Sequence, residues 1–268
     1  MDQVLYSVIL IITGITAGTA SGLFGVGGGF LMTPVQYWLY TSGGIDSTLA
    51  TRLAFGTSLA VIVPTLISGA LAHHKRGAVN WQAAIPMGCA AIFGGLTGGT
   101  LAAHLPGHVL RVIFALLIIA TAVRMVWHIR TCTVCEPRGS IPVYLVLGFL
   151  IGLVSGLAGI GGGILLVPVL VILLGYPMHT AVGTSSACLI FSSTGAVAAY
   201  VVHGTSVAGL PPYSMGYVNL VTFGILALTT IPFALVGVRF AHGCSGQKLQ
   251  VLFALVLILI GGMMLVSG

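Results

Sequence analysis

The stretch GITAGTASGLFGVGGGFLMTP, residues 14–34, decides the fold of this chain, because it recurs as GFLIGLVSGLAGIGGGILLVP at residues 148–168. Both copies carry glycines spaced by four residues, a Ser-Gly-Leu triplet, and a Gly-x-Gly-Gly-Gly run followed by a leucine and a proline. An apolar segment precedes and follows each copy. The same element is therefore used twice in one chain.

Two further matches follow the glycine stretches in the same order. The triplet Gly-Thr-Ser stands at residues 56–58 and again at 183–185, and GHVLRVIFAL at 107–116 matches GQKLQVLFAL at 246–255. Three matches in one order indicate a duplicated unit of about 134 residues, the difference between positions 148 and 14. Duplicated units of this kind are common in secondary transporters.

The composition places both units in a membrane. Of the 268 residues, 57% are hydrophobic and only 4% are charged, whereas soluble domains carry about 25% charged residues. This contrast excludes a soluble enzyme, and a disordered chain would need low hydrophobicity and high charge. The nine Lys and Arg residues form no basic stripe along the chain, so no nucleic-acid partner is expected.

Apolar runs in both units read as helices. Most reach the ~20 residues that a helix needs to cross the hydrocarbon core. Residues 28–41 and 162–175 are shorter and would span only about 21 Å at the usual rise per residue, which predicts broken or re-entrant segments. The expected helices are residues 3–22, 28–41, 48–72, 81–103, 109–129, 140–158, 162–175, 180–202, 214–238 and 248–267.

The fold expected from these runs is an all-α polytopic membrane protein built from two inverted five-segment repeats. It would have about eight full transmembrane helices, with a short broken or re-entrant helix after each glycine motif. Because each repeat has an odd number of segments, the second is inverted relative to the first, the architecture expected for alternating access. The repeats are residues 1–129 and 140–268, which a cytoplasmic linker at 130–139 joins into one transmembrane domain.

Basic residues orient the chain, because Lys and Arg collect in cytoplasmic loops. The loops 41–47, 104–108 and 203–213 contain no Lys or Arg and are therefore expected outside, together with both termini. The segments assigned to the cytoplasm hold Lys75, Arg76, Arg130, Arg138, Arg239 and Lys248.

The glycine runs are the expected substrate site. A regular helix is unfavourable there, since each glycine costs ~1 kcal/mol relative to alanine, but glycine can adopt positive φ and leave backbone groups open to a ligand. In lipid, such unpaired groups are tolerated only where they line an enclosed or watery cavity. The short helix after each run would point free N–H groups and its positive dipole end at that cavity, which suits an anion.

The polar residues near these runs leave alternatives open. Ser and Thr side chains could bind the anion, or could hydrogen-bond to the carbonyl four residues earlier in their own helix. Arg52 and His179 occupy matching positions in the two repeats, and could guide an anion at the two mouths or extend toward the interface. Asp46 is a candidate partner of Arg52. The glycines spaced by four are assigned to helix packing. The candidate substrate-binding residues are Ser21, Gly25, Gly27, Gly28, Gly29, Arg52, Thr57, Ser58, Ser155, Gly159, Gly161, Gly162, Gly163, Thr184 and Ser185.

Residue types that other functions need are scarce. The three acids are Asp2, Asp46 and Glu136, and none falls within an apolar run, so a relay of buried carboxylates is not expected. The eight histidines stand at helix ends or in loops, and any proton coupling is therefore expected to travel with the substrate. There is no Walker A sequence or catalytic cluster, so neither an enzyme nor a cofactor is expected. The Cys132–Cys135 pair alone has too few ligands for a zinc site.

The paired motif S-G-L-x-G-[VI]-G-G-G-x-L-x-x-P, each copy followed by G-T-S, resembles the sulfite exporter TauE/SafE family of membrane permeases. The resemblance covers essentially the whole chain. It implies a multi-pass transporter of the prokaryotic inner membrane that exports small sulfur-containing anions such as sulfite or organosulfonates, with residues 25–29 and 159–163 as the substrate loops. An anion channel, or a permease for carboxylates, sulfate or thiosulfate, is the alternative. The expected partners are the anion and the lipid bilayer, and a homodimer is left open.

Overall fold

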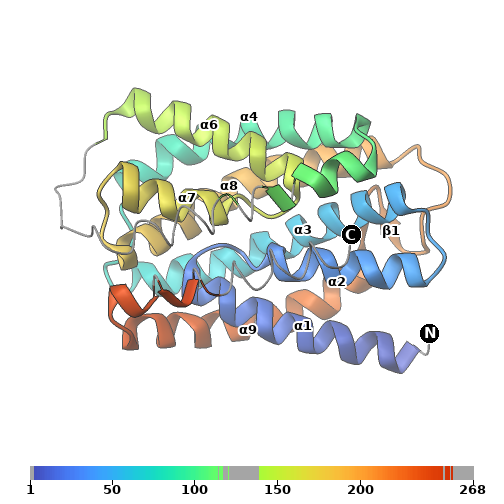
Figure 1. Cartoon of the computed structure of the whole chain (residues 1–268), viewed down its shortest axis with the longest axis horizontal. Coiled ribbons are helices and arrows are strands. Elements are labelled where there is room, and N and C mark those ends of the chain that lie inside the picture. Colours follow the sequence, from blue (N-terminus) through green and yellow to red (C-terminus); the bar gives the residue numbers. More distant parts are fainter. Residues whose placement is uncertain are drawn as a thin grey trace.

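The computed structural model describes residues 3–113, 115–116, 120, 139–249, 251–253 and 255 (Figure 1). The described part is helical apart from one two-stranded hairpin. Its helices are α1 (Gln3–Phe24), α2 (Gly29–Ser42), α3 (Ser47–His74), α4 (Trp81–His104), α6 (Ile141–Ala158), α7 (Gly163–Pro168), the π-helix η1 (Val169–Leu173), α8 (Met178–Gly204) and α9 (Leu220–Gly243).

Long apolar helices dominate the described residues. Six of them, α1, α3, α4, α6, α8 and α9, are long and apolar enough to cross a membrane. Polar side chains begin three of the six: Asp46 caps α3, Asn80 caps α4 and Asn219 caps α9, each by accepting a hydrogen bond from the first turn. Such caps satisfy N–H groups that have no partner within the helix. The all-α, multi-pass class predicted from composition is confirmed.

The fifth and tenth predicted helices are described only at their beginnings. These are the helical residues that follow Pro106 and Ser245. The remainder of both runs lies outside the described residues. So does the predicted linker 130–139 with Cys132 and Cys135, apart from Gly139. The expectation of eight full helices is therefore tested at six of them.

The ninth helix begins six residues later than the sequence predicted. Instead of helix from 214, Ser214–Met215 and Val218–Asn219 pair as antiparallel strands β1 and β2. Gly216 turns the chain with a φ of 57°, and Asn219 then caps α9 by accepting the Thr222 N–H at 2.9 Å. The run 214–238 was apolar enough to read as continuous, but its turn residue and its cap place the helix start at Leu220.

Two helical hairpins point in opposite directions across the molecule. In Figure 1, α1 runs from the N-terminus at the right toward the left and α2 returns to the right, whereas α6 starts at the left and α7 returns to it. Their tips are the two glycine loops, residues 25–28 and 159–162. The short helices predicted after these loops are confirmed, with 14 residues in α2 and a run of α7 and η1 that ends at Leu173.

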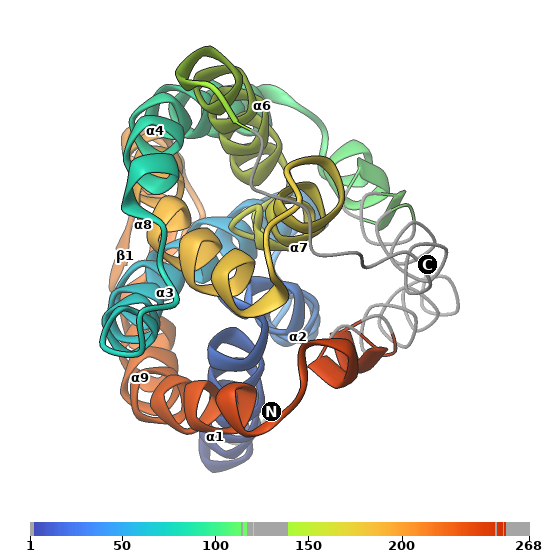
Figure 2. The same cartoon turned by 90° about the vertical axis from the view of Figure 1, so that its left-hand side faces the viewer.

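The glycines spaced by four pack helices together, as predicted. Gly14, Gly18 and Gly22 of α1 lie against the backbone or side chains of α9, and Gly148, Gly152 and Gly156 of α6 lie against α4. No Cβ would fit at these positions without movement of a neighbour. Figure 2 shows the two pairs, α1 with α9 and α4 with α6, on either side of α3 and α8. This arrangement holds the glycine loops at the centre.

Candidate functional site

The two glycine loops have the same backbone conformation. Gly25, Gly27 and Gly28 have φ values of 67°, 82° and 76°. Gly159, Gly161 and Gly162 have 64°, 83° and 71°. Because side-chain-bearing residues rarely adopt positive φ, both loops depend on glycine at these positions. Gly28 and Gly162 are the N-caps of α2 and α7 and place those helix starts inside the protein.

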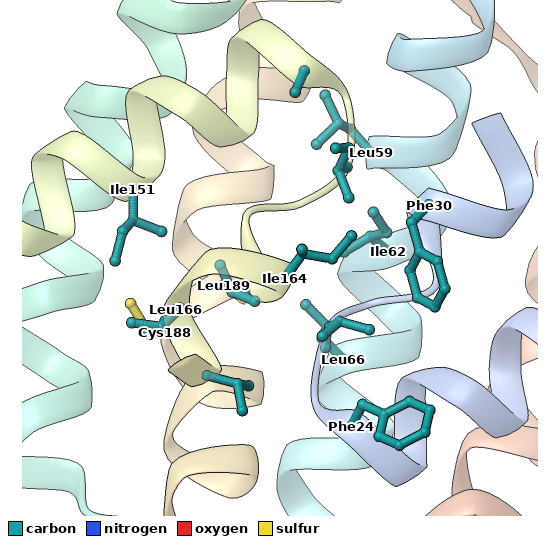
Figure 3. Packing of buried hydrophobic residues seen from close by; sticks show 14 of the residues in the cluster. Phe24, Phe30, Leu59, Ile62, Leu66, Ile151, Ile164, Leu166, Cys188 and Leu189 are labelled. Atoms are coloured by element: carbon teal, nitrogen blue, oxygen red, sulfur yellow. The ribbon is translucent and has the colours of Figure 1, made fainter. Parts of the chain in front are cut away.

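The loops meet each other by a reciprocal contact. A Cβ on Gly29 would lie 2.8 Å from the Ile160 carbonyl oxygen in the opposite loop. At the matching position, a Cβ on Gly163 would collide with the Val26 Cα. Ile62 of α3 lies beside both loops, next to Gly27 and Gly161, and Figure 3 shows it between Phe30 and Ile164. The two short helices therefore start from adjacent points.

Each loop is also held by polar side chains of the other half. Ser185 of α8 donates its hydroxyl to the Gly25 carbonyl at 2.9 Å, and Thr33 of α2 donates to the Gly159 carbonyl at 3.3 Å. The Gln36 amide donates to the Ser58 hydroxyl at 2.8 Å. Ser185 thus binds across the halves, whereas Ser58 accepts hydrogen bonds from Gln36 and Thr33 of α2 within its own half. The bonds described for these two serines are therefore not back-bonds to their own helices.

The Gly-Thr-Ser threonines make a second matched pair of contacts. The Asn219 backbone N–H donates to the Thr57 hydroxyl at 3.0 Å, and the Asn80 N–H donates to the Thr184 hydroxyl at 3.0 Å. Both threonines are fully buried. Sequence reasoning expected these hydroxyls to donate and did not single out either asparagine. The available signal was the residue type itself, since asparagine is a favoured N-cap: Asn80 precedes the run 81–103, and Asn219 lies within the run 214–238.

Several polar atoms near the loops are buried without a hydrogen-bond partner. They include the Gln36 amide oxygen and the hydroxyls of Ser155 and Ser193. Ser155 lies next to Gly162, and Ser193 lies near Gly161. Ser21, also a predicted site residue, is buried at the end of α1. Buried polar atoms are normally paired, so these unpaired groups mark positions where a polar ligand could bind.

The space beside Gly162 is nearly filled in this conformation. A void of about 10 Å³ remains there, lined by Val154, Ala158, Ile160, Gly162, Ile164 and Leu165. A cavity of this size holds at most one water molecule. Binding of an anion at this loop therefore requires the apolar lining to move.

Arg52 lies near the second glycine loop but is engaged elsewhere. Its guanidinium donates to the Tyr217 hydroxyl at 3.2 Å and to the Leu105 carbonyl at 3.0 Å. Phe55, one turn further along α3, contacts Gly159. Asp46, the candidate partner of Arg52, instead accepts hydrogen bonds from the Thr48 and Leu49 N–H groups. Arg52 therefore stands about one helical turn outside the loop rather than within it.

A separate basic groove lies on the outer side of α3 and α9. It has a volume of about 370 Å³ and carries the cations Lys75, Arg76 and Arg239. The Arg76 guanidinium donates to the Val238 carbonyl at 3.1 Å, which joins the ends of the two helices. The structure thus brings these three cations to one end of the molecule, as the loop assignment predicted.

The described residues form six apolar spans around two buried, irregular loops, which is the architecture of a multi-pass membrane protein. The chain belongs to the sulfite exporter TauE/SafE family, whose model matches residues 10–264. It is therefore a membrane transporter and not an enzyme, in agreement with the resemblance carried by the paired glycine motifs.

Relatives in distant prokaryotes cover most of the chain. It is 29% identical to a "probable membrane transporter protein" of Methanocaldococcus jannaschii, over 96% of this chain and 94% of that protein. It is 32% identical to one from Haemophilus influenzae over 85% of both. A third, from Bacillus subtilis, is 26% identical over 97% of this chain and 98% of that protein. No solved structure matches the chain.

Proposed function

We propose that this chain is a secondary active transporter that exports small sulfur-containing anions, such as sulfite or organosulfonates, across the prokaryotic inner membrane. The anion binds where the N-termini of α2 and α7 meet. The observation that carries this proposal is the reciprocal contact of the two glycine loops, Gly29 against Ile160 and Gly163 against Val26. The substrate class rests on the family's description as sulfite exporters.

The chemistry at the loops favours a negative charge. The first N–H groups of α2 and α7 have no acceptor within their helices, and the positive ends of both helix dipoles face the same region. The buried hydroxyls of Ser155 and Ser193 can donate further hydrogen bonds. Asp46, the acid that the described residues contain, sits at the exposed start of α3, so no described carboxylate repels an anion at the loops.

The matched contacts in the two halves support an inverted repeat. The matching glycines of the loops have similar φ values, the hairpins run in opposite directions, and Thr57 and Thr184 accept equivalent backbone hydrogen bonds. In transporters of this construction, one repeat rocks against the other around a fixed central site. Alternating access would then expose the glycine loops to each side of the membrane in turn.

Both ends of the bundle carry tyrosine clusters that suit this alternation. At one end, the hydroxyls of Tyr6 and Tyr40 bond to Thr222 at 2.8 and 3.2 Å. At the other, Tyr144 and Tyr176 bond to each other at 3.0 Å and Tyr176 accepts from Asn80 at 3.2 Å. Burial raises the pKa of the Tyr176 hydroxyl, so it stays neutral in its bonded state. In the proposed cycle these bonds break alternately.

The orientation follows from the cations. Lys75, Arg76 and Arg239 share one end of the bundle, which is then cytoplasmic. The N-terminus of α1 lies at the opposite end (Figure 1), and we therefore propose that it faces the outside.

A thermal-shift screen of the purified protein tests the substrate class. Sulfite, an organosulfonate, sulfate, thiosulfate and a small carboxylate are compared at equal ionic strength. A ligand that binds only the folded state raises stability by RT ln(1 + [L]/Kd). We expect a concentration-dependent shift with sulfite or a sulfonate, and loss of that shift in Gly162→Val. A shift with the carboxylate alone would favour the alternative of an organic-anion permease, and no shift with any anion would contradict the proposed site.

A further inference from the structure

Matching backbone carbonyls in the two repeats accept hydrogen bonds from different side chains. The Gly22 carbonyl of α1 is bonded by the His73 Nε2 at 3.1 Å. The equivalent Gly156 carbonyl of α6 accepts the Tyr200 hydroxyl at 3.1 Å. His73 and Tyr200 occupy corresponding positions, 15 residues after the Ser of each Gly-Thr-Ser triplet. Each bond lies three residues before a glycine loop.

Both contacts continue into aromatic and basic side chains. Beyond Tyr200, the Tyr217 ring packs edge-on at 6.3 Å, and Arg52 donates to the Tyr217 hydroxyl. Beyond His73, the His242 Nε2 lies 3.1 Å from the His73 Nδ1, and the His179 ring stacks on His242 with centroids 5.2 Å apart. His179 is the repeat equivalent of Arg52. One end therefore holds an arginine where the other holds imidazole rings, which can gain or lose a proton.

The geometry fixes the proton positions on His73 and His242. A carbonyl only accepts, so the His73 Nε2 that contacts Gly22 must carry a hydrogen. In a neutral imidazole the other nitrogen is then an acceptor, so the His73 Nδ1 receives its hydrogen bond from the His242 Nε2. One added proton can be shared between the two rings, because a protonated His73 Nδ1 can donate to His242 in its other tautomer. When both rings are protonated, the His73 Nδ1 and the His242 Nε2 both carry hydrogens and the bond between them is lost.

We propose that His73, His242 and His179 form a proton-binding site whose protonation releases α9 from α3 beside the first glycine loop. The ligand is a proton from the side of the membrane that carries Lys75 and Arg76. The site joins four elements, because His73 lies in the last turn of α3, His242 in the last turn of α9, His179 in the first turn of α8, and Gly22 in α1. This inference does not depend on the identity of the transported anion.

The described groups around His73 include no acid that would hold it permanently in its protonated form. The titratable and charged groups that face it are His242 of α9, His179 of α8 and Arg76 after α3, while α1 contributes the Gly22 carbonyl. His73 is fully buried, and the His179 Nδ1 is buried without a partner. No acid faces this cluster among the described residues, since Asp46 caps the opposite end of α3. Nor do the described residues hold a group of three or more His, Cys, Asp or Glu arranged for a metal ion.

The direction of the pH effect follows from the bond that breaks. The bonded state requires that one of the two rings stays neutral, so the second proton binds more strongly when α3 and α9 are released. The hydrogen bond between His73 and His242 is therefore intact at high pH and lost as the pH falls. The released population should grow by roughly tenfold for each pH unit below the midpoint of a one-proton site.

Hydrogen–deuterium exchange of the full chain in lipid nanodiscs tests this site without any substrate. Exchange is measured between pH 8 and 5.5 and corrected for the intrinsic pH dependence of amide exchange. We expect protection of segments 20–28 and 236–244 to fall by at least tenfold toward pH 5.5, while segment 196–205 at the other end changes little. His73→Gln, whose amide can still donate to the Gly22 carbonyl, should lose this pH response.

Two further variants keep the test decisive. His242→Gln removes the other side of the titrating bond and should also abolish the response, which covers the case in which His73→Gln does not fold. His203→Gln is the matched control, because His203 bonds to the Ala199 carbonyl of its own helix at 2.9 Å and packs edge-on against His104 rather than against this cluster. It should keep the wild-type response. A pH-independent wild type, or a response that survives in both His73→Gln and His242→Gln, would overturn the proposal.

Discussion

Gly163, the first residue of α7, packs directly against the Cα of Val26 in the opposite glycine loop. The equivalent contact, Gly29 against the Ile160 carbonyl, completes the pair. Any side chain at Gly29 or Gly163 would push the loops apart. The two short helices can therefore begin at adjacent points only because both positions are glycine.

Replacing either contact glycine by alanine should separate the loops. Neither Gly29 nor Gly163 has positive φ, so the effect isolates the lack of space for a Cβ. We expect Gly163→Ala to destabilise the protein by about 1–3 kcal/mol, the usual cost of overpacking, as measured by reversible denaturation in mixed micelles. Gly224→Ala is the control, because nothing lies within 4 Å of its Cβ position and alanine favours helix. Equal stability of the two variants would contradict the close approach of the loops.

The threonines of the Gly-Thr-Ser triplets should be important for stability. Thr57→Val keeps the shape but leaves the buried Asn219 N–H without its acceptor, which costs about 1–3 kcal/mol. Thr184→Val should act in the same way through Asn80. Thr194→Val serves as the comparison, since its hydroxyl is exposed and bonds only to Ile190 of its own helix, and surface changes of this kind stay within about 0.5 kcal/mol. Indistinguishable melting of all three variants would refute the role of these hydroxyls.

Gln36 should be sensitive to charge. Its amide nitrogen binds Ser58 while its oxygen has no partner. Gln36→Glu is nearly isosteric but can introduce a negative charge close to the proposed anion site, so anion-dependent thermal stabilisation should disappear. The matched change Gln247→Glu, at an exposed position after α9, should leave it intact. An unchanged anion response in Gln36→Glu would place the site elsewhere.

The orientation can be checked with two matched serines. Ser245 follows α9 at the end that carries Arg239, and Ser206 follows α8 at the opposite end; both are exposed. On a cysteine-free background in intact cells, Ser206→Cys should react with a membrane-impermeant maleimide and Ser245→Cys should not. The reverse pattern would mean that both termini face the cytoplasm.

The local features of the site could be predicted from the sequence, because they depend on residue type. Glycine runs specify positive φ at Gly28 and Gly162, and glycines spaced by four specify the packing of α1 on α9 and of α6 on α4. The contacts across the halves could not be read in this way. The bond from Asn219 to Thr57 joins residues 162 positions apart, and the meeting of His73, His179 and His242 depends on how three helices are aligned with one another.

The start of α9 also could not be predicted from the sequence pattern, although the contacts that set it are local. Hydrophobicity alone extended this helix back to residue 214, where the structure has a hairpin that turns at Gly216. Gln36 was overlooked for a related reason, since a single amide in an apolar helix becomes informative only when its neighbours are known. Ser58 is such a neighbour, 22 positions away in the sequence but within hydrogen-bonding distance in the fold.

Counterflow of radiolabelled sulfite in proteoliposomes tests the central claim most directly. Vesicles loaded with unlabelled sulfite, and containing either the wild-type chain or Gly28→Val at equal abundance, are diluted into labelled sulfite. A transporter that alternates around the glycine loops predicts saturable, transient accumulation of label by the wild type and none by Gly28→Val, whose φ of 76° a valine cannot readily adopt. Label entry that does not saturate and shows no overshoot would indicate a channel, and equal counterflow by the two proteins would contradict the placement of the site at the glycine loops.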